Sequence, residues 1–289
     1  MPKDKKGMRA AWLLILCAAF VILGGAFLGK YLRMAGTDKY SARILCQLPL
    51  LIPAAAGIIY TSRVCGRIYT AEALGIRGFS PAFTFLLLLL PLSARYFGAF
   101  IQFSEAGFIK EAFSVSPSSA PVNTVEMLML FLSNCIIAPT LEEIIFRGGV
   151  FKALEPYGSV RAVILSALGF AIIHFDTSGF IYLFLWGTVL GLVRVWSGSL
   201  FACMLFHSVL NFESFLHTVF VNDLQYVMDF LGGYATVMAY LFPVILLLTY
   251  ILFGRGKSVR KSVRSGLGGA VPMLLTVALY GLTALMRHM

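Results

Sequence analysis

Two adjacent glutamates and an arginine interrupt an apolar stretch near the middle of the chain. Glu142, Glu143 and Arg147 are flanked by small or apolar residues at 133–138 and 144–146. A charged side chain at bilayer depth costs about 3 kcal/mol or more, so charged groups there face a cavity or a partner and carry function. The alternative is a charged interfacial turn at the end of a helix, and these ten residues by themselves favour neither interpretation.

The spacing of the three charged residues assigns them to different faces of a helix. Glu143 and Arg147 stand four residues apart, which on a helix brings opposite charges within reach of each other. Glu142 projects about 100° away from its neighbour. We therefore predict that Glu143 and Arg147 form a supporting pair, and that Glu142 is the carboxylate available for acid–base chemistry.

Three further polar residues interrupt apolar runs in the same way: His174, His207 and Asn211. His207 and Asn211 are four residues apart, so they share one helix face about a turn from each other. A single histidine on an apolar helix is more often a hydrogen-bonded structural residue than a catalyst. The chemistry of these residues therefore depends on whether they meet the glutamate.

Depth along the helices places the four residues in one layer. If the helix that carries Glu142 continues to about Leu154, the glutamate lies about 18 Å from the helix end at 1.5 Å per residue. The same measure gives depths of roughly 21 Å for His174, about 12 Å for His207 and about 18 Å for Asn211. All four fall in the middle of a bilayer core that is about 30 Å thick.

A carboxylate, two imidazoles and a carboxamide at one level supply the groups that peptide hydrolysis needs. Glu142 and His174 can hold a water molecule and remove its proton. His207 and Asn211 can donate hydrogen bonds to the oxyanion of the tetrahedral intermediate. The four residues therefore predict a hydrolytic site inside the membrane.

The same residue types also permit a metal site, because glutamate and histidine are zinc ligands. The chain has no HExxH pattern, and the carboxylates and histidines lie on three separate predicted helices. The five cysteines are far apart and show no CxxC spacing, so we interpret them as small core residues. No cofactor is expected, and zinc is the less favoured alternative.

The elements that must position these residues are membrane helices. The chain of 289 residues is 59% hydrophobic and only 12% charged, with a mean hydropathy of +0.87, so it has too little polar surface for a soluble globule. We predict an all-α, polytopic bundle of about eight or nine transmembrane helices with the active site inside the membrane. Nine candidate spans occur at 10–29, 44–62, 83–102, 127–147, 161–175, 179–196, 199–220, 231–253 and 267–286.

The charged residues favour one orientation of this bundle. The net charge of +10 does not indicate nucleic acid as a partner, because the lysines and arginines are scattered in short segments between apolar runs. Placing the N-terminus in the cytoplasm puts most of these cations inside and the acidic loops outside; the connection 30–43 is the exception. We find no repeat and predict one transmembrane domain over 1–289, with a catalytic core at 127–213 and a Ser/Pro-rich loop at 114–121.

Three motifs in this order resemble the CAAX prenyl endopeptidase and bacteriocin-processing membrane protease family, abbreviated CPBP or Abi. They are EExxxR at 142–147, FxxxH at 170–174 and HxxxN at 207–211. Each motif alone is weak, but their order and their placement in membrane helices are specific, although together they cover under a third of the chain.

The resemblance implies an intramembrane, glutamate-dependent endopeptidase without an obligatory metal. Carried over residue by residue, Glu142 and His174 would activate the water, and His207 and Asn211 would form the oxyanion site. The supporting motif residues would be Glu143, Arg147 and Phe170. The flanking helices match no part of the family pattern, and we expect substrate choice to reside there.

Two other classes of protein remain open on the residues alone. A non-catalytic membrane scaffold, immunity or regulatory protein could use buried polar groups for helix packing, although packing alone does not require a glutamate, two histidines and an asparagine at matched depth. A proton-coupled transporter could use intramembrane carboxylates and histidines, but the chain lacks the paired half-repeats that many transporters show.

The expected partners are membrane lipid and a protein or peptide substrate, with or without a prenyl group. The family name suggests a prenylated C-terminal CAAX protein, but no residue pattern here recognises a prenyl group. The compact form favours a bacterial inner membrane, with the N-terminus in the cytoplasm, over an internal membrane of a eukaryote.

Overall fold

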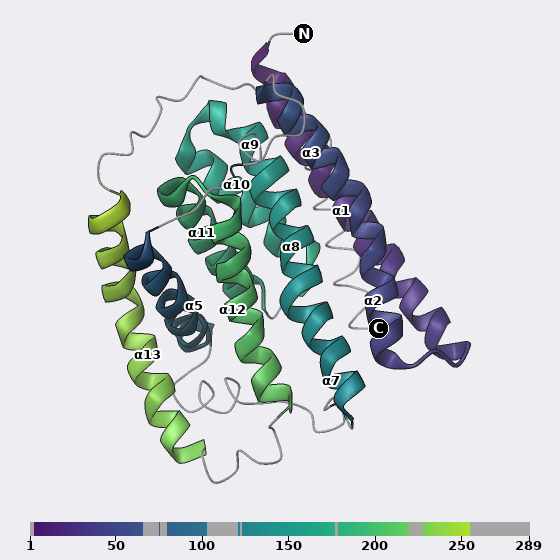
Figure 1. Cartoon of the computed structure of the whole chain (residues 1–289). Helices are drawn as coiled ribbons and strands as arrows, with labels where there is room; N and C mark the ends of the chain where they lie inside the picture. Colours follow the sequence, from purple (N-terminus) through teal and green to yellow (C-terminus); the bar gives the residue numbers. More distant parts are fainter. Residues whose placement is uncertain are drawn as a thin grey trace. The chain divides into compact units, whose positions relative to one another are not determined.

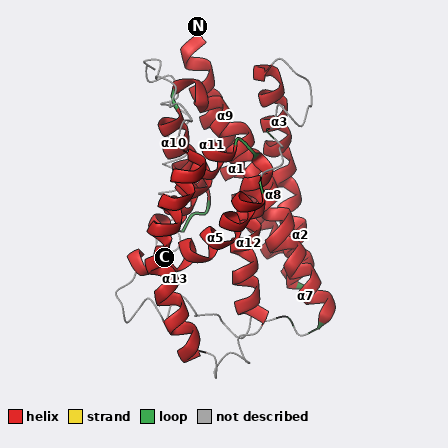
Figure 2. Cartoon of the chain, turned by 60° about the vertical axis from the view of Figure 1, so that its left-hand side comes forward, coloured by secondary structure: helices red, strands yellow, loops and turns green. Residues whose placement is uncertain are grey.

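A computed structural model describes residues 3–65, 75, 80–102, 121, 123–176, 179–219 and 228–254. All regular structure within these ranges is helical, as the prediction of an all-α fold requires (Figure 2). The described residues form two compact units: the first draws on 1–78 and 141–203, and the second draws on 79–140 and 204–255.

The first unit is built around helices that pack closely on one another. Its main elements are α1 (Lys3–Met34), α2 (Lys39–Gln47), a 3₁₀ turn at Leu48–Leu50, α3 (Leu51–Cys65), α10 (Ser159–Ile173) and α11 (Phe180–Ser197). Helix α1 packs along α2 and α3, and α10 packs against α11 (Figure 1). Gly187 permits the second contact, because a Cβ atom there would lie 2.8 Å from the Cα atom of Ala167.

The second unit is held together largely by aromatic side chains. It contains α5 (Pro81–Gln102), α7 (Thr124–Phe131), most of α12 (Leu200–Val219), α13 (Met228–Thr249) and a π-helical end at Tyr250–Gly254. Helices α5 and α13 lie side by side (Figure 1), with the rings of Phe97 and Phe242 stacked at 4.7 Å between centroids. Phe131 of α7 meets Phe215 of α12 edge to face at 5.6 Å.

One long helical segment, Thr124–Tyr157, carries the glutamate pair. Asn123 caps its start, where the side-chain oxygen accepts a hydrogen bond from the backbone N–H of Glu126 at 2.9 Å; asparagine is a favoured residue type at this position. The helix passes without interruption through Gly148 and Gly149 to Leu154, which confirms the continuous helix assumed for the depth of Glu142.

This segment becomes π-helical twice, once on each side of the glutamates. Its parts in order are α7, a π-helical stretch η3 (Leu132–Ile137), α8 (Ala138–Glu143), a second π-helical stretch η4 (Ile144–Val150), α9 (Phe151–Leu154) and a 3₁₀ turn η5 (Glu155–Tyr157). Wider π turns are uncommon and occur often at functional sites. Pro139 explains the first one in part, because it has no N–H to continue the α-helical ladder.

The predicted spans agree with the described helices in position, but their number is not confirmed. Among the described residues, five helices are long and apolar enough to cross a membrane: Lys6–Met34, Lys39–Arg63, Thr124–Tyr157, Phe180–Ser197 and Val237–Gly254. Three more predicted spans correspond to shorter apolar helices at Pro81–Ala94, Ser159–Ile173 and Leu200–Leu216. The ninth, 267–286, lies outside the described residues, so the count of eight or nine is not confirmed.

Candidate active site

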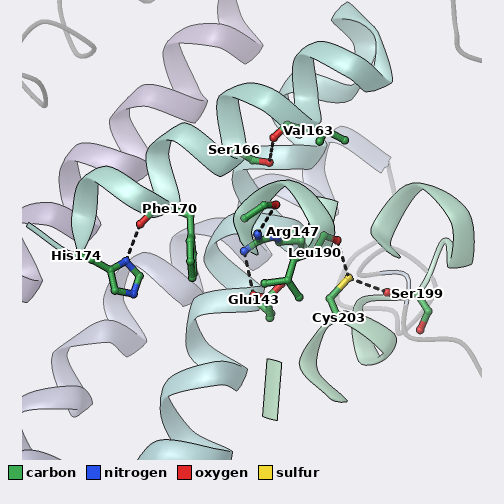
Figure 3. A network of polar contacts seen from close by, with 10 residues as sticks. Glu143, Arg147, Val163, Ser166, Phe170, His174, Leu190, Ser199 and Cys203 are labelled. Atoms are coloured by element: carbon green, nitrogen blue, oxygen red, sulfur yellow. Dashed lines mark hydrogen bonds and ion pairs between the residues drawn. The ribbon is translucent and has the colours of Figure 1, made fainter. Parts of the chain in front are cut away.

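Glu143 and Arg147 form a fully buried ion pair, as their spacing predicts. Arg147 Nη1 lies 3.0 Å from Glu143 Oε1, and both side chains are 0% exposed. Arg147 Nη2 also donates to the carbonyl oxygen of Gly187 on α11 at 2.9 Å. The arginine therefore ties the first motif to a neighbouring helix as well as to its own glutamate (Figure 3).

Glu142 differs from its neighbour in burial. Its side chain is only partly buried, whereas Glu143 is completely enclosed. The two adjacent carboxylates thus occupy different environments, as their angular separation on the helix predicts. The assignment of Glu142 as a base stays a prediction.

Phe170 connects the first motif to the second. Its ring lies edge to face against Phe146 at 5.5 Å between centroids, and the guanidinium carbon of Arg147 stands 4.9 Å from the ring centroid. A cation over an aromatic face is stabilised by the ring quadrupole. Phe170 also contacts the imidazole of His174 at 4.6 Å between centroids, so Glu143, Arg147, Phe170 and His174 form one connected set.

His174 is held in one tautomer by its own helix. Its Nδ1 atom lies 2.7 Å from the carbonyl oxygen of Phe170 (Figure 3). A carbonyl can only accept a hydrogen bond, so Nδ1 carries the proton and, in the neutral ring, Nε2 keeps a lone pair. The side chain is thereby prepared to accept a hydrogen bond from water or to bind a cation through Nε2.

The backbone at His174 departs from the predicted span 161–175. Helix α10 ends at Ile173, and His174 is its C-terminal cap. The next residue, Phe175, has a φ of +50°, which is unusual for a residue other than glycine. Such strain persists only where the surroundings enforce it and is frequent at active sites. The turn-forming residues at 176–179 were the available signal that the helix stops here.

His207 and Asn211 lie on α12 within the second unit. His207 is 6% exposed, and Asn211 is partly buried. Asn211 Nδ2 donates to the backbone oxygen of Asn134 in η3 at 2.9 Å. One of the two amide protons of Asn211 is used in this bond, so the other remains available. The grouping of these two residues with Glu142 and His174 stays a prediction.

Comparison with known proteins identifies the segment that carries all these residues. A family model described as type II CAAX prenyl endopeptidase, Rce1-like, matches residues 124–212. The segment is Rce1-like. A search of curated proteins and a search of solved structures each found no match.

The Rce1-like match confirms the resemblance seen in the three motifs. The matched residues run from the first residue of α7 to one position beyond Asn211, so they include every predicted site residue. The family is described as one of endopeptidases, and the five helices of sufficient length and apolarity in the described part of the chain point to a membrane protein.

Several contacts of the Rce1-like segment were not foreseen from the sequence. They involve the Gly187 carbonyl, the Asn134 carbonyl and Thr61, whose hydroxyl lies 2.6 Å from the carbonyl oxygen of Gly148. Gly187 could have been found, because Gly187 and Gly191 form a GxxxG pattern that is typical of close helix contacts. Backbone carbonyls leave no residue-type signal, so the other two contacts could not.

Metal binding is not tested by the side-chain placement. Within the described ranges no three histidine, cysteine, aspartate or glutamate side chains are gathered as a metal site would require. The four cysteines whose side chains are described are free thiols: Cys17, Cys46, Cys135 and Cys203. The preference for a metal-independent reaction stays a prediction.

Proposed function

We propose that this protein is a CAAX-type intramembrane endopeptidase that hydrolyses a peptide bond near the membrane surface. The observation that carries the proposal is the connected set Glu143, Arg147, Phe170 and His174 inside the segment that matches the Rce1-like family. This set fixes the helix that presents Glu142 and orients His174, the two residues predicted to activate water.

The hydrogen bond from His174 Nδ1 to Phe170 supports a specific role for the imidazole. Its Nε2 lone pair accepts a hydrogen bond from one proton of the attacking water, while the Glu142 carboxylate removes the other. The water oxygen then bonds to the substrate carbonyl carbon. The scissile C–N bond breaks as Glu142 returns the proton to the leaving amine.

In this proposal His207 and Asn211 stabilise the negative charge that develops on the substrate oxygen. An imidazole N–H and the second amide proton of Asn211 donate to this oxyanion, and removing such a donor typically lowers kcat about 10²- to 10³-fold. The support for this role is the motif order and matched helix depth, together with the amide proton that remains on Asn211.

The decisive experiment compares new peptide termini by mass spectrometry in cells that produce wild-type protein or Glu142→Gln. We expect the substitution to preserve membrane insertion and to reduce cleavage by at least about 10²-fold, as for loss of a general base. Glu126→Gln is the matched control, because Glu126 lies in the first turn of the same helical segment. Equal cleavage by wild-type protein and Glu142→Gln would contradict the proposal.

The substrate class and the metal requirement extend this proposal. We propose a membrane-associated or lipidated protein or peptide that is cut close to its C-terminus, in a bacterial inner membrane with the N-terminus of the protease in the cytoplasm. We also propose that no metal is required. Purified protein should keep full activity after chelation and contain no zinc by elemental analysis, and loss of activity that added zinc restores would overturn this part.

A further inference from the structure

The carbonyl oxygen of Asn134 occupies a special position in the hydrogen-bond ladder of its helix. At the end of η3 the backbone N–H of Ala138 donates to Ser133, five residues back, and not to Asn134, four residues back. The N–H of Ala138, which would donate to Asn134 in an α-helix, is therefore bonded to Ser133 instead. The donor to Asn134 in the π-helical ladder would be the N–H of the residue five positions on.

That residue is Pro139, which has no N–H. Both backbone positions that normally supply a donor to Asn134 are thus removed, one by the change of ladder and one by the proline. A carbonyl oxygen left in an apolar helix without a donor is unfavourable. The side-chain nitrogen of Asn211 on α12 supplies the missing donor and lies 2.9 Å from the Asn134 oxygen.

This contact fixes the carboxamide of Asn211. The Asn134 oxygen can only accept a hydrogen bond, so the NH₂ group of Asn211 must face it, and the side-chain oxygen must face away. One amide proton is committed to Asn134, and the direction of the second is set by the planar amide group. A backbone donor at position 139 would compete for the same oxygen and release the carboxamide.

We infer that Pro139 is a positioning residue for catalysis. Because it has no N–H, the Asn134 carbonyl remains without a backbone donor and accepts a hydrogen bond from Asn211. This bond fixes the Asn211 carboxamide with its second amide proton directed to the substrate. The inference rests on the proposed function only in the role that Asn211 plays towards the oxyanion. The anchoring of Asn211 itself is a structural statement and can be tested without any substrate.

The structural test uses protein labelled with ¹⁵N-asparagine in detergent micelles or nanodiscs. The chain has four asparagines, and the side-chain NH₂ signals of Asn211 are assigned by their loss in Asn211→Gln. We expect one Asn211 amide proton to be shifted downfield and slow to exchange with solvent in wild-type protein, and to lose both properties in Pro139→Ala. Retention of both properties in Pro139→Ala would overturn the inference.

Pro243→Ala is the matched control, because Pro243 also lies inside a helix of the second unit. It should leave the Asn211 signals unchanged. If Pro243→Ala shifts them as much as Pro139→Ala does, the effect is a general loosening of the unit, and the specific role of Pro139 is refuted.

The kinetic test separates positioning from folding. We expect Pro139→Ala to lower kcat roughly 10-fold with little change in KM, and to have no further effect on kcat in an Asn211→Ala background. Full additivity of the two substitutions would overturn the positioning role. If wild-type protein cleaves no peptide, the proposed function fails, whereas the asparagine signals still decide whether Pro139 anchors Asn211.

Discussion

Each of the two π-helical stretches of the long helix has a backbone carbonyl that accepts a hydrogen bond from a side chain of another helix. In η3 the carbonyl of Asn134 accepts from Asn211, a residue of the third motif. In η4 the carbonyl of Gly148 lies 2.6 Å from the hydroxyl of Thr61 on α3, a residue outside all three motifs, and the one proton of this hydroxyl is shared with the carbonyl of Gly57 at 2.8 Å. The two cases differ in origin: the residue five positions beyond Asn134 is a proline, whereas at the end of η4 the N–H of Phe151 donates to Phe146 and passes over the carbonyl of Arg147, not that of Gly148.

The contacts found at the two stretches differ in kind. Beside the bond from Thr61, η4 has the ion pair of Arg147 with Glu143, the bond from Arg147 to Gly187 and the contact with Phe170. At η3 the side chain of Asn211 donates to the carbonyl of Asn134. We infer from this difference that η4 sets the frame of the first unit, whereas η3 orients the carboxamide of Asn211, and the following predictions test that contrast.

The largest effect is expected from removing the charged anchor of η4. Arg147→Met leaves the buried Glu143 carboxylate without its partner at 3.0 Å, and breaking a buried pair in this way typically lowers the free energy of unfolding by about 3–5 kcal/mol. Thermal or denaturant unfolding in detergent micelles measures the loss. The double variant Glu143→Leu/Arg147→Met should recover part of it, and no recovery would show that the ion pair is not the cause.

A smaller loss of stability is expected from a substitution that pushes α11, which supplies the Gly187 carbonyl, away from α10. In Gly187→Ala the new Cβ atom would stand 2.8 Å from the Cα atom and 3.2 Å from the oxygen of Ala167. Backbone atoms cannot move aside as a flexible side chain can, so we expect a loss of about 1–3 kcal/mol in the free energy of unfolding. Gly24→Ala is the control, since no atom lies within 4 Å of a Cβ there. Equal loss in both variants would contradict the close-contact explanation.

Loss of the hydrogen bond from Thr61 should lower the free energy of unfolding less than loss of the ion pair does, and about as much as loss of the hydrogen bond from Asn211. Thr61→Val removes a hydroxyl that lies 2.6 Å from Gly148 O in a fully buried position. The expected loss in the free energy of unfolding is about 1 kcal/mol, similar to other hydrogen bonds between membrane helices. Thr61→Ser should restore the wild-type value.

The control for Thr61 is another buried threonine. The Thr249 hydroxyl donates to Ile245 within its own helix at 2.7 Å, and Thr249 is 1% exposed. Thr249→Val therefore removes a hydroxyl without removing a contact between helices. If Thr249→Val is as destabilising as Thr61→Val, the attachment of α3 to η4 contributes nothing measurable.

The smallest change in the free energy of unfolding is expected at the exposed helix cap Asp38. This cap serves as a comparison for the hydrogen bonds from Thr61 and Asn211. The Asp38 side chain accepts hydrogen bonds from the backbone N–H groups of Ser41 at 2.9 Å and Tyr40 at 3.0 Å. The bonds to Ser41 are the main cause that lowers the pKa of Asp38 below its ordinary value. A depressed carboxyl pKa gives stability that is present above the ordinary value and is lost as pH falls through the depressed one.

Unfolding measured against pH tests the Asp38 cap. Wild-type protein and Asp38→Ala should differ slightly at neutral pH, and this difference should shrink only below about pH 4, the ordinary pKa of an aspartate. Asp38→Asn keeps a side-chain acceptor and should show almost no dependence on this titration. A difference between wild-type protein and Asp38→Ala that persists unchanged at low pH would exclude the carboxylate as its source.

The sequence by itself determined the all-helical class, the positions of most helices and the residues of the three motifs. It also predicted the Glu143–Arg147 pair, which forms as expected. These features are local: residues four apart on a helix meet whatever the rest of the chain does. Hydrophobic runs likewise mark helices that must avoid water wherever they pack.

Only the tertiary structure decided which groups from distant parts of the chain contact each motif residue. Arg147 reaches a carbonyl on α11, Phe170 receives the guanidinium on its ring, and Asn211 takes the oxygen that Pro139 leaves without a donor. The end of α10 at Ile173, before His174, also became visible only in the folded backbone. Partners of this kind are backbone atoms and ring faces from other segments, and because every residue carries a carbonyl, no pattern of residue types reveals which one will be free.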